Sequence, residues 1–97
     1  MSIEVFDAGD EPYQHWMRLN EHGVVANTGR SQDSRKFTVH WARCFHIAKY
    51  GAGQTEDCFT KGDFVKICSV DASDLEAWAS LNRTRVTQIR QCRSCRR

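Results

Sequence analysis

Two close pairs of metal-binding side chains lie far apart in this chain of 97 residues. His40 and Cys44 form the first pair, and Cys92 and Cys95 form the second. Two cysteines separated by two residues direct their sulfurs at one cation from a tight turn, and zinc is the ion that such cysteine and histidine sets typically bind. The sequence therefore predicts a fold in which both pairs meet at one Zn²⁺ ion.

The spacing of the first pair also predicts where a strand ends. Four residues of a straight strand span about 13 Å, which is too far for two ligands of one ion. Side chains four residues apart lie on one face when the backbone is helical or tightly turned. We therefore expect the strand at 36–41 to end near His40 or Trp41, and the chain to bend before Cys44.

Other ligand sets remain open. Cys68 lies at the end of an expected strand and is a rival to His40 as the fourth ligand, and His46 and Cys58 are weaker candidates. Alternatively, the cysteines before residue 70 are ordinary small buried hydrophobic residues. A disulfide framework is not expected, because five cysteines cannot form a closed set and a reducing cytosol would not maintain one.

Two segments have the signals of helices that pack on a core. Asp10, Glu11 and Pro12 are typical of a helix start, with Asp10 as the capping acid, and Gly23 is a natural stop, so we expect a helix over 11–21. A second helix is expected over 74–82, because Ser73 and Glu76 have the spacing of a capping box.

Short segments rich in β-branched and aromatic residues predict strands at 23–27, 36–41, 63–68 and 84–90, the first two joined as a hairpin. Residues 1–9 are expected to be a frayed or edge segment. A chain of this length forms one domain, here 1–97. We therefore expect an α+β fold in which a small antiparallel sheet of three to four strands packs with two helices and is tied by one zinc.

Charge is divided unevenly along the chain. Residues 1–82 hold all twelve acidic residues and eight of the fourteen basic ones, a net charge of −4, whereas residues 83–97 hold six arginines and no acidic residue. Guanidinium groups bind phosphate oxygens through paired hydrogen bonds. The C-terminal segment is therefore a candidate phosphate-binding surface, and the alternative is a solvated tail that balances the acidic residues.

The arginines nearest the expected zinc are the candidate nucleic-acid contacts. Arg93, Arg96 and Arg97 are expected to contact phosphates, and Arg43 to line the site. Trp41 can stack on a base, although tryptophan is more often a core residue. A zinc ion held by one imidazole and three thiolates carries one net negative charge, which these arginines would partly balance.

The frame of a histidine or cysteine, three residues, a cysteine and a later Cys-x2-Cys resembles the zinc-binding module of the Ada DNA-repair family. It is also similar to small zinc modules appended to nucleases. The matching stretches are 36–46 and 90–96. The resemblance implies a structural zinc beside a DNA-facing surface. It does not imply methyl transfer, because His40 stands where the Ada family has the thiolate that accepts the methyl group.

We therefore expect a non-catalytic, zinc-stabilised module that binds nucleic acid, DNA in particular, as an accessory in DNA repair, restriction or regulation. The alternatives are a protein–protein adaptor or inhibitor with a structural zinc, and a small metal-dependent enzyme with His46 or an acid as base. The chain has no nucleophile-elbow or paired-carboxylate pattern. It has no transmembrane run or signal-peptide pattern either, so we expect a cytoplasmic location and no membrane partner.

Overall fold

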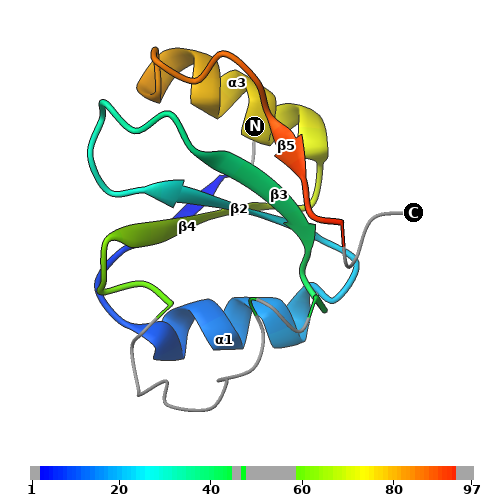
Figure 1. The fold of residues 1–97 in the computed structure, drawn as a ribbon. Helices are drawn as coiled ribbons and strands as arrows, with labels where there is room; N and C mark the ends of the chain where they lie inside the picture. The colour runs from blue at the N-terminus through cyan, green and yellow to red at the C-terminus, as the bar shows by residue number, and fades with distance from the viewer. Residues whose placement is uncertain (1–2, 45–46, 48–58, 94–97) are drawn as a thin grey trace.

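The computed structural model describes residues 3–44, 47 and 59–93, and it shows an α+β fold in which a mixed sheet separates two helices (Figure 1). The elements are β1 (Glu4–Phe6), α1 (Asp10–Leu19), β2 (Val24–Gly29), β3 (Phe37–Trp41), β4 (Phe64–Ser69), α3 (Ala72–Asn82) and β5 (Arg90–Gln91). The five strands lie in the order β1-β4-β2-β3-β5. All neighbours are antiparallel except β3 and β5, which are parallel.

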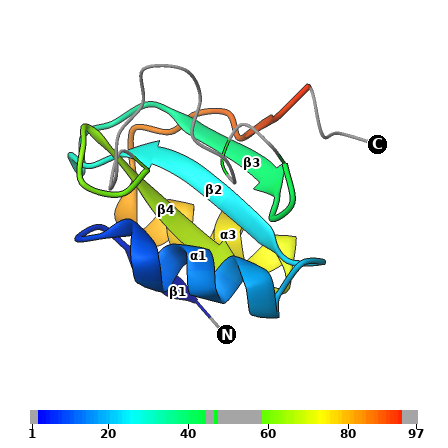
Figure 2. The same cartoon turned by 90° about the horizontal axis from the view of Figure 1, so that it is seen from below.

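The two helices cover opposite faces of the sheet. In Figure 1 α1 lies below the sheet and α3 above it, and Figure 2 shows α1 in front with α3 behind. Each face has its own hydrophobic cluster. Within β2, Val25 belongs to the cluster on the α1 side, whereas Val24 and Ala26 belong to the cluster on the α3 side. Successive side chains of a strand point to opposite faces, so β2 is apolar on both.

Helix α1 starts one residue before the predicted position and packs Tyr13 and Met17 against the sheet. The prediction that Asp10 caps this helix is wrong, because α1 has no side-chain cap hydrogen bond. The carboxylate of Asp10 instead accepts hydrogen bonds from the amide of Phe59 (3.1 Å) and the hydroxyl of Thr60 (2.7 Å). It thereby ties the helix start to the chain that leads into β4.

Helix α3 begins two residues earlier than predicted, at Ala72, and its cap is Asp71 rather than Ser73. One carboxylate oxygen of Asp71 accepts hydrogen bonds from both the amide and the hydroxyl of Ser73, each at 2.9 Å. The Ser73 hydroxyl is therefore held as a donor to Asp71. Neither helix in the described part of the chain is long and apolar enough to cross a membrane.

The sheet is larger than predicted because both ends of the chain add to it. Residues 4–6 form an edge strand on β4, in agreement with the predicted edge segment. The predicted strand at 84–90 is wrong except for Arg90. The amide of Val86 bonds to the carbonyl of Arg83, which closes a turn, and Val86 and Ile89 then pack on the α3 side. Only β5 beyond them pairs with β3.

Candidate metal centre

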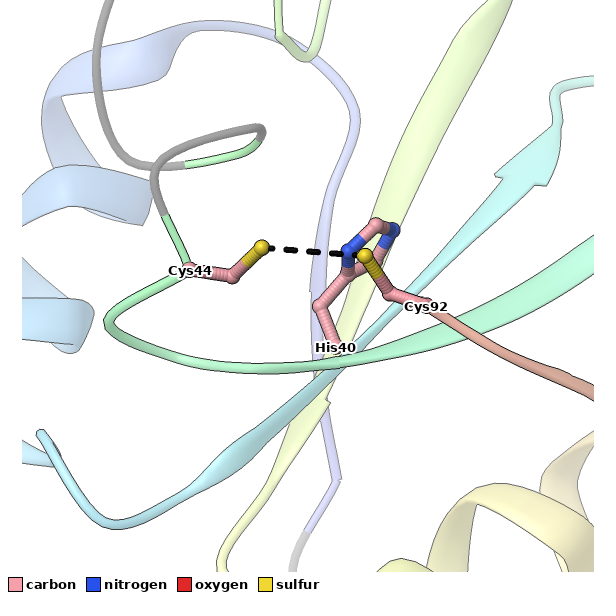
Figure 3. A group of neighbouring side chains, drawn as sticks. All are labelled: His40, Cys44 and Cys92. Atoms are coloured by element: carbon pink, nitrogen blue, oxygen red, sulfur yellow. Dashed lines mark hydrogen bonds between the residues drawn. The ribbon is translucent and has the colours of Figure 1, made fainter. Parts of the chain in front are cut away.

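Three of the four predicted zinc ligands come together in one buried group. The ligand atoms of His40, Cys44 and Cys92 all lie within 4.8 Å of one another, so these residues are close enough to bind a metal ion. Figure 3 shows the two sulfurs and the imidazole facing a common point. The residues are 8%, 4% and 7% exposed, and the Nδ1 atom of His40 is fully buried.

The local backbone explains why the group forms. Strand β3 ends at Trp41, and the amide of Cys44 bonds to the carbonyl of Trp41 at 2.9 Å, so the chain turns before Cys44. This confirms the prediction drawn from the His40–Cys44 spacing. On the other side, the amide of Cys92 bonds to the carbonyl of Val39 at 2.9 Å, which extends the β3–β5 pairing up to the ligand.

The fourth predicted ligand, Cys95, lies outside the described residues, as do Cys58 and His46. The rival ligand Cys68 is described and stands apart from the group. It lies on β4 opposite Val25 of β2, and Val25 in turn lies opposite His40 of β3, so a whole strand separates Cys68 from His40. Cys68 is fully buried, and burial raises the pKa of its thiol. It therefore behaves as a core residue.

The group also forms part of the core on the α1 side. Cys44 and Cys92 pack in the same cluster as Met17 and Ala42, and the hydroxyl of Tyr13 donates a 2.8 Å hydrogen bond to the carbonyl of Ile47. Burial raises the pKa of Tyr13, which keeps the hydroxyl a donor. The metal-binding group is thus continuous with the packing of α1.

The described members of the candidate nucleic-acid surface are solvent-accessible. Trp41 is 38% exposed, and Arg43 and Arg93 are exposed. Each arginine is next to a cysteine of the group, so both lie beside it. Arg96 and Arg97 lie outside the described residues. The other two tryptophans pack against the hydrophobic clusters, and the ring of Trp78 stacks on Phe37.

The structure shows a charge pattern that we did not predict. Parallel pairing of β3 with β5 places Thr38 and Val39 beside Arg90 and Gln91, and neither residues 34–44 nor residues 90–93 include an acidic residue. We call these two segments the basic edge; its exposed cationic residues are Arg35, Lys36, Arg43, Arg90 and Arg93. The absence of acids from both segments was visible in the sequence, but their adjacency depends on the strand order.

Comparisons with models of protein families, with curated proteins and with solved structures found no match for this chain.

Proposed function

We propose that this protein is a non-catalytic nucleic-acid-binding module, with DNA as the favoured ligand, and that a structural zinc ion holds its binding edge together. The observation that carries the proposal is the acid-free basic edge beside the metal-binding group. The proposal is in keeping with the motif likeness to Ada-type and nuclease-associated zinc modules. It places the protein in the cytoplasm, where thiols stay reduced.

Zinc fits the donor atoms that the structure brings together. Thiolate and imidazole are the ligands of structural zinc sites, and two sulfurs bound to one tetrahedral zinc at ~2.3 Å lie about 3.8 Å apart. The sulfurs of Cys44 and Cys92 are separated by 3.8 Å. His40 supplies the nitrogen donor, and we propose Cys95 as the fourth ligand from its spacing to Cys92. Bound zinc would join the end of β3 to the end of β5.

A closed set of four protein ligands favours a structural role. A catalytic zinc keeps one position open for water or substrate, whereas a site of one histidine and three cysteines has none. The residues of the group are also buried, which limits the access of a substrate. We therefore favour binding over catalysis for this protein.

The basic edge supplies the electrostatic part of the proposal. Arg43 and Arg93 make no ion pair or hydrogen bond with any residue in the described part of the chain, and both side chains are exposed. Arg90 is exposed on β5 opposite Thr38. Phosphate contacts of this kind supply most of the affinity of non-specific nucleic-acid binding. The exposed ring of Trp41 would add a stacking surface for a base.

The test is the affinity of the full chain for short labelled DNA and RNA, measured by fluorescence anisotropy over a range of salt concentrations. We expect tight binding that weakens with salt, and a salt slope that falls by about one for each of Arg43→Gln and Arg93→Gln. Arg85→Gln is the matched control, because Arg85 lies outside the basic edge and has an acidic neighbour, Asp33, at 3.6 Å. Weak binding that none of these changes affects would favour the protein–protein adaptor.

Zinc is tested separately, by elemental analysis and native mass spectrometry of the purified protein. We expect one zinc per chain, lost on treatment with a strong chelator and absent from Cys44→Ser. Cys68→Ser is the matched control, since Cys68 is buried but stands apart from the group. A metal-free chain that folds normally would contradict the zinc part of the proposal.

A further inference from the structure

A depression beside the metal-binding group is lined by α1 and by the turn that follows β3. Helix α1 contributes Gln14, Met17 and Arg18, and the turn contributes Ala42 and Arg43. Its volume is about 330 Å³. The depression therefore brings two arginines from distant parts of the sequence to one place.

The floor of this depression is part of the core that contains the metal-binding group. Met17 and Ala42 are 8% and 1% exposed, and both pack in the cluster that includes Cys44 and Cys92. Gln14 is half-buried, whereas Arg18 and Arg43 are exposed. Three polar side chains thus line the depression together with two buried apolar ones that belong to the core between α1 and the sheet.

The two arginines have no partner of opposite charge in the described part of the chain. Neither Arg18 nor Arg43 takes part in an ion pair or a hydrogen bond there. The carboxylate of Glu21, beyond the end of α1, lies 3.5 Å from the Nε2 atom of His22 and makes no ion pair with either arginine. Within α1 the acidic residues are Asp10 and Glu11, which are in the first turn, while Arg18 is in the last. Two turns of helix separate them by roughly 11 Å.

We propose that this depression is a subsite for one phosphate group of a nucleic-acid backbone, bound between the guanidinium groups of Arg18 and Arg43. Two like charges lining one concavity repel each other, and an anion between them relieves that repulsion. Guanidinium groups bind phosphate through paired hydrogen bonds, and the amide of Gln14 adds a neutral donor. The proposal rests on the proposed function and extends the basic edge onto α1.

The subsite also depends on the metal-binding group. Arg43 directly precedes Cys44, and the hydrogen bond from the Cys44 amide to the Trp41 carbonyl fixes the turn that carries it. A ligand that holds Cys44 in place therefore also holds Arg43 near α1.

The test combines four variants of the full chain with two probes. The variants are Arg18→Gln, Gln14→Leu, the double change of Arg18 and Arg43 to Gln, and Arg85→Gln. The first probe is inorganic phosphate, followed by NMR of the arginine Nε–Hε groups, and the second is a labelled DNA oligonucleotide. Gln14→Leu removes a donor without changing the charge, and Arg85→Gln removes one positive charge outside the depression and the basic edge, where Arg85 lies 3.6 Å from Asp33.

We expect phosphate to shift the signals of Arg18 and Arg43 with one common dissociation constant. We expect Arg18→Gln to weaken DNA binding about fivefold, and Gln14→Leu to weaken it by a smaller factor. The double variant should lose less than the product of the losses of Arg18→Gln and of the Arg43→Gln variant used to test the proposed function, because both guanidinium groups hold the same phosphate.

Two further outcomes separate this proposal from the proposed function. If DNA binding depends on Arg43 and Arg93 but not on Arg18 or Gln14, the subsite is overturned and the proposed function stands. If phosphate shifts Arg18 and Arg43 together but no nucleic acid binds, the anion subsite stands, and both its assignment to a nucleic-acid backbone and the proposed function are overturned.

Discussion

Among single residues, Tyr13 joins the first helix to the chain beyond the metal-binding group. Its hydroxyl donates to the carbonyl of Ile47, whose own amide bonds to the carbonyl of Cys44 at 3.1 Å. Tyr13→Phe keeps the ring in the core but leaves that carbonyl without its donor. We expect a loss of about 1–2 kcal/mol of unfolding free energy, measured by urea denaturation with and without zinc.

The Tyr13 variant should also bind zinc more weakly, because the chain that follows Cys44 loses one of its anchors. Thr28→Val serves as the comparison, since Thr28 also donates a hydroxyl hydrogen bond, to the carbonyl of Lys36, at the far end of β3. Equal zinc affinity in the two variants would show that Tyr13 contributes to stability alone.

Asp71 controls the start of α3 and gives that helix a dependence on pH. Its hydrogen bonds from Ser73 hold the pKa of the carboxyl below its usual range. A lowered pKa in the folded state adds stability above the unfolded value of about 4, and this contribution is lost as the pH falls through the folded pKa. We expect Asp71→Ala to lower the melting temperature at pH 7 by a few degrees.

Asp71→Asn separates the cap from the charge, because asparagine caps a helix about as well as aspartate. Its melting temperature at pH 7 should stay close to that of the unchanged protein, with a shallower decline below pH 4. Differential scanning calorimetry at several pH values measures both. A decline as steep as that of the unchanged protein would show that Asp71 does not carry this pH dependence.

At the scale of elements, β5 is held by very little besides the metal-binding group. It has two residues, both exposed, and it pairs only with β3. Removal of the proposed zinc should therefore release β5 first. We expect a chelator to abolish the hydrogen-exchange protection of the Cys92 amide, which bonds to the carbonyl of Val39, while the amides of β2, which lies between β3 and β4, stay protected. Simultaneous loss in both strands would mean that the metal supports the whole fold equally.

Local sequence signals predicted most helices and strands, because the spacing of apolar residues within a segment matches the face that the segment buries. Tyr13 and Met17 share a buried helical face, and β3 ends where the ligand spacing required. The pairing of β1 with β4 was not visible in the same way, since strand order depends on contacts between distant segments. Lys66 shows the limit of such local signals, because a lysine in an alternating strand is normally expected to face solvent. It is instead 4% exposed, and its ammonium donates to the side chain of Asn27 (2.7 Å) and the carbonyl of Phe59 (2.8 Å).

The candidate site was predictable in its ligands but not in its surroundings. Residue type and spacing indicated His40, Cys44 and Cys92, because metal coordination demands those donors. The same reasoning left Cys68 open as a rival, since only the sheet register places a strand between it and His40. Arg18 gave no signal at all, because its proximity to Arg43 arises from the packing of α1 against the turn after β3.

In the whole molecule, the two outer edges of the sheet differ in charge. The basic edge occupies one side of the sheet, whereas β1 at the opposite edge carries Glu4 and is followed by Asp7. We therefore expect an anionic polymer to approach the β3–β5 side of this protein rather than the β1 side. A modest net charge of +2 is thus compatible with nucleic-acid binding, because the distribution of charge matters more than its sum.

The sheet divides the core into two small clusters, so we expect the proposed zinc to add to the stability of the fold. A ligand that binds only the folded state adds about 2.7 kcal/mol at a free concentration 100 times its dissociation constant. For a domain of this size that gain raises the melting temperature by roughly 10–20 °C. We expect the melting temperature, followed by circular dichroism, to rise with free zinc and to be unaffected by magnesium, which prefers oxygen ligands. Cys92→Ser should abolish the rise in melting temperature with zinc, and Cys68→Ser should keep it. If zinc raised the melting temperature of both variants equally, it would bind elsewhere in the protein.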